Sequence, residues 1–486
     1  MPSSHPKVKR LPEQFISDDR RVITRLFLPG DTQRLQNIVN RILRLSPGQV
    51  EAELAGVISD FASRHRNIEE TLDEHCRQAI GRISDPGQLS AAQRRLIGAY
   101  FTMEYSIESA ALFNPSIVPH ADQSGLAPGA CRFIMSLRAT GEGHISSIVF
   151  KTGVIDPSGD VRFDHTTRMV GSARPDRNAT YEKYTFFLKL IEMGVYTEET
   201  GNILEHLPEE FYFGDLERVT NEYLKSEEAT PSTQETADDM LWLARSNYQL
   251  SFPSDCPISE VVIFPVTENE SRGIEDARFV RFTDDDGSVT YYGTYTAYNG
   301  FRILPQLLRT DDFSRFRIIT LNGHCVQNKG MALFPRKIDG RYLMIGRLDG
   351  ENLHLMTSTN VRFWNEADIL RGPQHPWEFI QIGNCGSPIE TDRGWILLTH
   401  GVGPMRRYCI GAMLLDLENP SRIIAASTEP LLSPNEKERE GYVPNVVYSC
   451  GAMLHNGQLI IPYAMADSAT SIATISIDDL FAHLLK

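Results

Sequence analysis

Short β-type runs recur between turn signals from residue 258 to the end of the chain, and this rhythm is the strongest constraint on the fold. Three hairpin-type dipeptides separate some of these runs: Asp286-Gly287, Asp339-Gly340 and Asn456-Gly457. A few short strands, a longer loop and then more strands is the pattern of small antiparallel sheets repeated around a channel. The sequence therefore predicts a β-propeller rather than a sandwich, but the repeat is too diverged to give the number of blades.

Helical patterns replace the β-type runs in two places. Residues 31–103 carry apolar side chains at i, i+3, i+4 and i+7, and Ser46 and Ser90 each begin a capping-box pattern. A second helical stretch spans roughly residues 180–250, where Ser232 begins another such pattern. Because β-type runs resume on both sides of this second stretch, we interpret it as an insertion into the β unit.

These patterns predict a domain organisation. We expect an α-helical N-terminal extension at residues 1–110, followed by a β-propeller catalytic unit at residues 111–486. The helical insertion occupies about residues 178–250 of that unit. Helical additions of this kind are suited to subunit contacts, so we expect a homo-oligomer.

The composition limits the classes of partner. The net charge of −15 argues against nucleic acid and anionic membranes, so an anionic substrate needs a local cationic pocket. The seven cysteines are scattered without CxxC spacing, which favours reduced thiols over a zinc site or a disulfide framework. The first fifteen residues hold no apolar signal region, and no window reaches about 18 apolar residues. We therefore expect a soluble, cytoplasmic protein without a metal site.

Two adjacent carboxylates, Glu275 and Asp276, stand where a β-type run begins. Acidic residues are poor strand formers, and a surface turn with a salt bridge to Arg278 is the ordinary explanation of such a pair. In an extended chain, neighbouring side chains point to opposite faces. We therefore expect one carboxylate to face a channel and the other to brace the chain.

Further polar residues begin or end otherwise apolar runs. Each one has an ordinary structural explanation, such as a solvated cation, a buried histidine or a turn-forming aspartate. A propeller brings the strand starts of every blade to one channel, so these residues are predicted to converge although they lie far apart in sequence. They are Asn114, Arg138, Asp276, Lys329, Arg347, His400 and Asp467.

Several motifs follow one another in a specific order: "GIEDARFV", "NKGMALFPRKIDGRYLMIGR", "GWILLTHGV", "GAMLLDLENPSRII", "EGYVPNVVYSCG" and "PYAMADS". This ordered set resembles glycoside hydrolase family 130, the β-mannoside phosphorylases and their hydrolase relatives. "FNPSIVPH" followed by "RFIMSLRA" resembles the first blade of that family. The resemblance covers roughly residues 112–480 apart from the insertion, and it implies an all-β, five-bladed propeller with the active site in its central cavity.

The resemblance also implies residue roles. Asp276 matches the general acid of the family, which protonates the glycosidic oxygen through a hydroxyl group of the mannosyl unit. Three residues match phosphate-binding positions: Lys329, Arg347 and His400. Four more are expected to contact the sugar: Asn114, Arg138, Glu275 and Asp467. Ala277 and Gly330 depart from residues common in the family, which leaves the subgroup open.

The residue types favour phosphorolysis over hydrolysis. An inverting hydrolase needs an acid and a base, with carboxyl groups about 6.5–9.5 Å apart. Phosphate is already an anionic nucleophile, so a phosphorylase needs one acid and cations that position the phosphate. We expect a glycosyltransferase-type phosphorylase that converts β-mannosides, and in particular β-1,2-mannooligosaccharides, to α-mannose 1-phosphate with phosphate as co-substrate and no cofactor.

Two alternatives remain open from the sequence. An inverting β-mannosidase of the same fold would need a second carboxylate, for which Glu142, Glu436 and Glu440 are candidates. A non-catalytic carbohydrate-binding propeller would have no need of an acid beside phosphate-binding cations. β-1,4-linked mannosides remain open as substrates as well.

Overall fold

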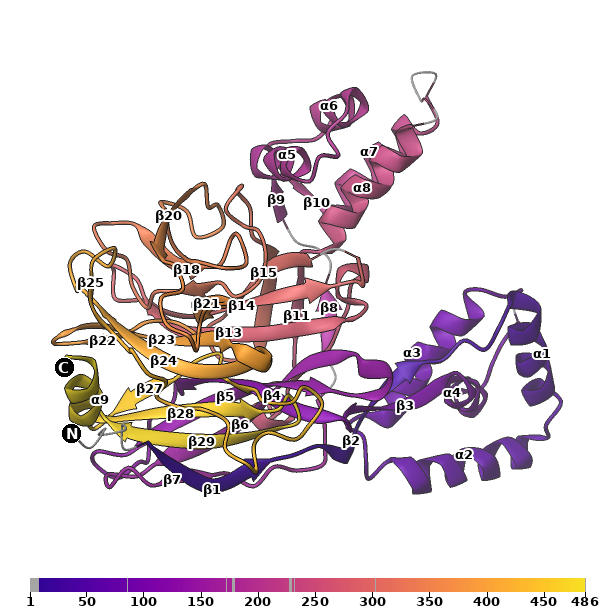
Figure 1. The fold of residues 1–486 in the computed structure, drawn as a ribbon. Helices are drawn as coiled ribbons and strands as arrows, with labels where there is room; N and C mark the ends of the chain where they lie inside the picture. The colour runs from indigo at the N-terminus through magenta and orange to yellow at the C-terminus, as the bar shows by residue number, and fades with distance from the viewer. Residues whose placement is uncertain are drawn as a thin grey trace.

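Antiparallel strands form the body of the protein, and most of the helices gather in two lobes that project from the stacked sheets (Figure 1). The computed structural model describes residues 8–84, 86–171, 173–176, 180–226, 230, 232–301 and 303–485. The predicted recurrence of short strands is confirmed, since the strands from residue 111 onward form antiparallel groups in chain order.

Five such groups follow one another along the chain. The first holds β4 (Ala111–Pro119), β5 (Cys131–Thr140), β6 (Ser146–Ile155) and β7 (Val161–Phe163), with β12 (Val262–Ile263) paired to β6. The second holds β13 (Gly273–Thr283), β14 (Val289–Tyr298), β15 (Ile303–Thr310) and β16 (Arg315–Thr320), extended by β11 (Tyr248–Ser251) and β8 (Arg174–Asp176). A parallel contact between Gly273 and Ser146 joins these two groups.

The other three groups are separate sheets. The third is β17 (Ala332–Leu333), β18 (Tyr342–Gly346), β19 (Leu353–Ser358) and β20 (Glu366–Arg371). The fourth is β21 (Gln381–Asn384), β22 (Ile389–Thr391), β23 (Gly394–Gly403), β24 (Arg407–Leu415) and β25 (Ile423–Ala426). The fifth is β26 (Val447–Tyr448), β27 (Met453–His455), β28 (Gln458–Met465) and β29 (Ala469–Ser476), and it includes β1 (Lys9–Phe15).

Hairpin turns lie where the sequence predicts them. Asp339 and Gly340 have φ of 50° and 71°, and Asn456 and Gly457 have φ of 46° and 71°. Positive φ at both central residues is the requirement of a type I′ turn, whose twist matches that of the flanking strands. These turns set the register of β17–β18 and β27–β28.

The first helical lobe lies between β2 (Asp18–Leu26) and β3 (Thr102–Glu108), which pair with each other. It consists of α1 (Thr32–Leu43), α2 (Pro47–Phe61), α3 (Ile68–Ile80) and α4 (Ala91–Tyr100). The capping boxes predicted at Ser46 and Ser90 are both present. Their apolar faces meet in a core of their own, which includes Leu35, Val39 and Leu96.

The second lobe contains α5 (Lys183–Glu192), α6 (Glu198–Glu205), α7 (Phe213–Tyr223), α8 (Thr233–Arg245) and the hairpin of β9 (Thr180–Glu182) with β10 (Glu210–Tyr212). Ser232 makes no capping bond through its side chain, so the capping box predicted there is wrong. Residues 178, 179, 227–229 and 231 of the expected insertion lie outside the described residues. Helix α9 (Ile477–Leu484) ends the described chain, and among the described helices none has the length and apolarity of a membrane span.

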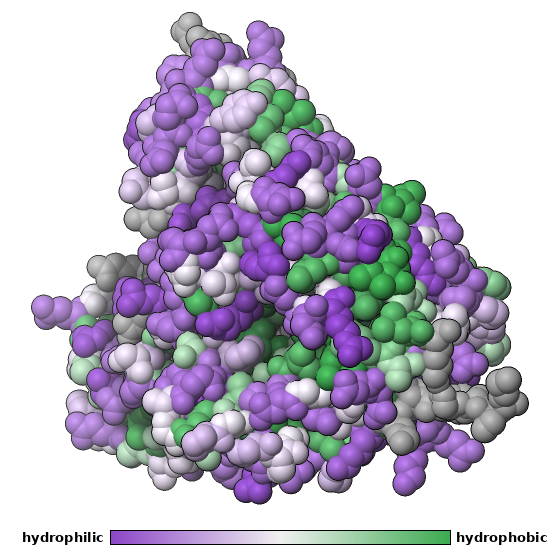
Figure 2. Space-filling view, turned by 90° about the vertical axis from the view of Figure 1, so that its left-hand side faces the viewer, coloured by the Kyte–Doolittle hydropathy of each residue, from purple (hydrophilic) through white to green (hydrophobic). Residues whose placement is uncertain are grey.

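The surface agrees with the acidic, polar composition. Figure 2 shows one face that is mostly hydrophilic, with a hydrophobic area beside its centre and the second helical lobe rising above it.

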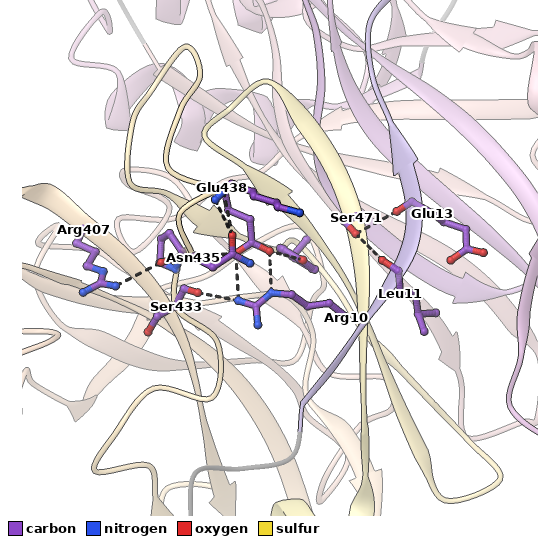
Figure 3. Close-up of polar contacts among 11 residues, drawn as sticks. Arg10, Leu11, Glu13, Arg407, Ser433, Asn435, Glu438 and Ser471 are labelled. Atoms are coloured by element: carbon purple, nitrogen blue, oxygen red, sulfur yellow. Dashed lines mark hydrogen bonds and ion pairs between the residues drawn. The ribbon is translucent and has the colours of Figure 1, made fainter.

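The N-terminal segment is not wholly helical, which corrects the expectation for residues 1–110. Strand β1 pairs with β29 and thereby joins the first part of the chain to the last sheet. Pro12 hides this strand from sequence analysis, but proline is tolerated on an edge strand, and the register of β1 shifts between Arg10 and Gln14. Ser471 Oγ donates to the carbonyl oxygen of Glu13 at 3.0 Å (Figure 3).

A buried carboxylate holds β1 against the loop before β26. Glu438 is 3% exposed and accepts hydrogen bonds from Arg10 Nε at 2.7 Å and from the Tyr463 hydroxyl at 2.7 Å. Arg10 also donates to the Ser433 carbonyl oxygen at 2.8 Å (Figure 3). Because Arg10 lies on the first strand of the chain, these bonds fasten that strand to the loop before β26.

We expect Glu438→Ala to lower the free energy of unfolding by about 2–4 kcal/mol, because it leaves the partners of a buried carboxylate unsatisfied. Urea unfolding measures the change. Glu390→Ala is the control, since Glu390 pairs with Arg336 at the surface, where such pairs contribute about 0–1 kcal/mol. An equal loss of unfolding free energy in the two variants would contradict a role for Glu438 in holding β1.

Candidate active site

The polar residues predicted from sequence come together at one place, and each of the five strand groups contributes to it. Asn114 and Arg138 come from β4 and β5, Glu275 and Asp276 from β13. The remaining positions flank or lie on strands of the third, fourth and fifth groups: Lys329, Arg347, His400 and Asp467. Hydrogen bonds or electrostatic interactions connect all of these residues, directly or through neighbours.

The two carboxylates do not point to opposite faces, which corrects the expectation from strand alternation. The register of β13 against β14 shifts between Glu275 and Arg278, so one extra residue is accommodated there as a bulge. Asp276 occupies the left-handed region at φ 55°. The bulge turns both carboxylates toward Arg138, whose guanidinium lies 3.0 Å from Glu275 Oε1 and 3.4 Å from Asp276 Oδ1.

Asn114 is placed by a similar irregularity. The register of β4 against β5 shifts between Phe113 and Ser116, and Asn114 has φ 48°. Its Nδ2 donates to Asp276 Oδ1 at 2.6 Å, while its buried Oδ1 has no hydrogen-bond partner in the described part of the chain. Non-glycine residues with positive φ often mark functional sites, because the surrounding fold must hold the strain.

Lys329 is bound to the first carboxylate. Its Nζ donates to Glu275 Oε2, and it lies 5.7 Å from the centre of the Tyr298 ring. Glu275 therefore lies between Arg138 and Lys329, which supports its role in bracing the site. Glu275 pairs with Arg138 and Lys329 and not with Arg278, the partner expected for one of the two carboxylates. Arg278 Nη1 donates instead to the Asp276 carbonyl oxygen at 2.9 Å.

The cations keep Asp276 ionised. Burial alone would raise the pKa of this carboxyl, but Arg138, Arg278, the hydrogen bond from Asn114 and Lys329 together hold the pKa below its ordinary value. In the free protein, Asp276 is therefore a carboxylate at neutral pH. Asp276 could hold a proton at neutral pH only if a bound ligand raised its pKa.

Three residues that sequence analysis did not select connect the acid to the cationic side of the site. Arg278 is 3% exposed, and it donates from Nε to Asn384 Oδ1 at 3.0 Å and from Nη2 to the Tyr448 hydroxyl at 2.6 Å. Asn384 lies in "QIGNCG" and Tyr448 in "NVVYSC", short runs of mixed polar and apolar residues. That signal is too common to identify them without the fold.

His400 is neutral. Burial, Arg347 and Arg278 hold the pKa of its imidazole well below the ordinary value. Its Nδ1 lies 3.1 Å from the Asn384 carbonyl oxygen, which can only accept, so the proton sits on Nδ1 and Nε2 is free to accept. Arg347 Nη1 lies 3.4 Å from that Nε2. His400 thus orients Arg347 and adds no positive charge of its own.

Arg347 has little else to bind. Its Nε is buried without a hydrogen-bond partner, and its guanidinium forms no ion pair with a carboxylate among the described residues. A buried donor without a partner is costly unless a ligand supplies an acceptor, although the rest of this guanidinium is only part-buried. The arrangement is suited to a multivalent oxyanion.

Asp467 is the third carboxyl group of the site. Burial and the nearby Asp276 carboxylate raise the pKa of Asp467 to about 6, against the opposing effect of Arg138 and Arg406. It has φ 50° and lies in the turn between β28 and β29.

The alternative base candidates stay outside this cluster. Glu142, Glu436 and Glu440 are exposed, and no described contact joins their carboxyl groups to Asp276. Within the described residues there is also no group of three or more histidine, cysteine, aspartate or glutamate side chains that could hold a metal ion.

The chain is similar to several mannoside phosphorylases. A family model described as beta-1,4-mannooligosaccharide phosphorylase matches residues 255–485. The 1,2-beta-oligomannan phosphorylase of Thermoanaerobacter sp. (strain X514) is 35% identical over 222 residues, which cover 44% of this chain and 72% of the relative. A beta-1,2-mannobiose phosphorylase of the same strain is 34% identical and covers 42% of this chain and 68% of the relative.

Among solved structures, the beta-1,2-mannobiose phosphorylase of Listeria innocua in complex with beta-1,2-mannobiose is 20% identical, with a TM-score of 0.46. The alignment covers 78% of this chain and 93% of that chain.

We expect Asp467→Asn to stabilise the protein more at pH 7.5 than at pH 5. A carboxyl pKa raised from 3.8 to about 6 means that the unfolding free energy falls as pH rises through this range. The amide does not ionise and so avoids that loss. The unfolding free energy of the variant should therefore exceed that of the wild type by about 1–3 kcal/mol at pH 7.5, and this gain should be about 1 kcal/mol smaller at pH 5.

Urea unfolding at both pH values checks this expectation. Asp311→Asn is the control, because the Asp311 side chain is 68% exposed and its removal should change little at either pH. A destabilised Asp467→Asn variant, or a gain that does not depend on pH, would show that the ionised carboxylate does not strain the site.

Proposed function

The chain belongs to glycoside hydrolase family 130, and from this premise we propose that it is an inverting β-mannoside phosphorylase. It cleaves β-1,2-mannooligosaccharides with inorganic phosphate and releases α-mannose 1-phosphate. The β-1,2 linkage follows the names of the two curated relatives above, although the family model carries a β-1,4 description. The enzyme needs no cofactor beyond phosphate as co-substrate.

We propose that the five strand groups are the five blades of a propeller. The order of the groups supports this proposal, as does β1, which pairs with the last group and would close the ring. The catalytic unit then spans residues 111–486 together with β1, and residues 1–110 otherwise form an extension that carries the first helical lobe.

The unpaired guanidinium of Arg347 is the observation that carries the phosphorylase proposal. A hydrolase has no use for an arginine held by a neutral histidine and left without a carboxylate partner. Inorganic phosphate provides two or more acceptor oxygens and the negative charge that this residue lacks. Lys329 lies on the Glu275 side of the site and can contribute its remaining donors to the same anion.

We assign the general-acid role to Asp276. Its pKa is low in the free protein, but a bound phosphate adds negative charge beside it and offsets the influence of Lys329 and Arg278. The pKa of Asp276 then rises toward the range in which it can hold and deliver a proton. Delivery through a sugar hydroxyl group is the route that the family resemblance implies.

The sugar-binding roles belong to the groups that surround this acid. Asn114 has a free buried Oδ1, and Asp467 is placed to accept from sugar hydroxyls once it is ionised. Arg138 and Glu275 hold the acid in place, and we assign them to the sugar-binding side of the site.

We further propose that the enzyme works in the cytoplasm as a homo-oligomer. All seven cysteines are free thiols, which suits a reducing compartment. The two helical lobes project from the sheets and offer surface for contacts between subunits (Figure 1).

We expect Arg347→Gln to raise the KM for phosphate by about tenfold to a hundredfold, since it removes charge-assisted bonds of about 1.5–3 kcal/mol. The KM for the mannoside should change much less. Initial rates of mannose 1-phosphate formation at varied phosphate measure both constants. Arg422→Gln is the control, because Arg422 pairs with Asp416 on the surface. A phosphate KM that stays unchanged would remove the basis for phosphorolysis.

We expect Asp276→Asn to abolish turnover, with a loss of at least about a hundredfold, because the amide cannot donate a proton as an acid does. The variant should unfold at a urea concentration close to that of the wild type, since the amide is isosteric. Steady-state rates and urea unfolding are the two measurements. Near-normal activity would mean that another group is the acid.

A further inference from the structure

A second cationic site lies far along the sheet from the residues described above. A cavity of about 420 Å³ opens where the second helical lobe meets strands β14–β16 and the loop between β19 and β20. This volume is in the range of small-molecule sites. The cavity shares no lining residue with the candidate active site, and Figure 1 shows its elements at the root of the projecting lobe.

Two arginines, Arg309 and Arg362, line this cavity, and Arg317 lies beside Arg309 on the sheet. Arg309 pairs in register with Tyr292 on one side and with Arg317 on the other, so the three side chains form a row on one face of the sheet. Like charges directly opposite each other destabilise a sheet. Arg362 approaches the row from the β19–β20 loop, and burial together with Arg317 and Arg309 lowers the pKa of its guanidinium.

Little in the described structure balances these charges. The guanidinium groups of Arg317 and Arg362 form no hydrogen bond or ion pair with any described residue, although Glu182 lies near Arg362. Arg309 approaches the exposed carboxylate of Asp311 only to 4.0 Å. The two guanidiniums that line the cavity and the one beside them are therefore short of acceptors.

A buried hydroxyl group at the same cavity also lacks a partner. Thr320 lines the cavity and is 3% exposed, yet its Oγ1 has no hydrogen-bond partner among the described residues. An unsatisfied buried hydroxyl group costs about 1–3 kcal/mol unless a ligand or water completes it. Tyr292 presents a second hydroxyl group to this space.

The loop that carries Arg362 is held in place. The backbone N–H of Asn322 donates to the Arg362 carbonyl oxygen at 2.8 Å, and Trp364 Nε1 donates to the Val361 carbonyl oxygen at 2.9 Å. The backbone that carries Arg362 is therefore fixed before any ligand arrives, which lowers the entropic cost of binding.

We propose that this cavity binds a phosphorylated sugar. Its phosphate group lies on Arg309 and Arg362 with Arg317 behind them, because a dianion satisfies several guanidiniums where a carboxylate satisfies one. Its hydroxyl groups bond to Thr320 Oγ1 and to the polar side chains around it. The site itself does not depend on the proposed function, but α-mannose 1-phosphate as the preferred probe does.

The test is isothermal titration calorimetry with α-mannose 1-phosphate, mannose 6-phosphate and inorganic phosphate. The titrations use the full chain carrying Lys329→Ala and Arg347→Gln, which removes the phosphate contacts of the active site. We expect one remaining site for a mannose phosphate. Adding Arg362→Gln should raise its Kd by about tenfold or more, the equivalent of one charge-assisted hydrogen bond. Arg218→Gln is the matched control, because Arg218 pairs within helix α7 of the same lobe.

The outcomes separate this proposal from a structural role and from the proposed function. Without ligand, Arg362→Gln should keep or raise the melting temperature, since it relieves repulsion; a lower one would indicate a structural arginine. No binding that depends on Arg362, or inorganic phosphate bound as tightly as both sugar phosphates, would overturn the proposal. If the active site is not a phosphate site, the wild type and the Lys329→Ala/Arg347→Gln variant will bind inorganic phosphate alike. The rise in the Kd for the sugar phosphate caused by Arg362→Gln will remain.

Discussion

The site depends on one interaction: the guanidinium of Arg138 lies between the carboxylates of Glu275 and Asp276 and pairs with both. Two adjacent acids would repel each other and raise each other's pKa if no cation lay between them. Arg138 contacts both, Lys329 takes the outer oxygen of Glu275, and Arg278 binds the backbone of Asp276. This distribution keeps Asp276 ionised and leaves Arg347 as the guanidinium available to an incoming anion.

The backbone makes this arrangement possible. A regular strand would send Glu275 and Asp276 to opposite faces, and only a bulge with a left-handed aspartate brings both toward one arginine. Asn114 adopts the same left-handed conformation at the register shift of β4. Strain at two separate strands that meet at one point is characteristic of a site built for ligands rather than for stability. Asp467 illustrates the cost, because its raised pKa weakens the fold where the carboxylate is ionised.

Sequence analysis predicts the elements well where local rules decide them. Capping boxes and type I′ turns depend on a few neighbouring residues. The structure confirms the boxes at Ser46 and Ser90 and the turns at Asp339 and Asn456. Strand β1 is not predicted from the sequence, because its pairing partner lies more than 450 residues away and a proline interrupts its pattern. The bulge at Asp276 is missed for a different reason, since no local signal distinguishes it from a regular strand start.

The site residues show a similar division. Strand-bounding polar residues such as Arg138 and His400 are visible in sequence, whereas their partners are not. Asn384 is important only because its carbonyl oxygen fixes the tautomer of His400 and its side chain binds Arg278. The neutral state of His400 depends on burial between Arg347 and Arg278, which no spacing reveals.

The most direct test of the account is a product assay by NMR on β-1,2-mannobiose and β-1,4-mannobiose, each with and without inorganic phosphate. The account predicts that turnover requires phosphate, that β-1,2-mannobiose is the preferred substrate, and that α-mannose 1-phosphate is the first product. Free mannose formed at the same rate without phosphate would contradict it, because water would then be the nucleophile and Arg347 would need another ligand.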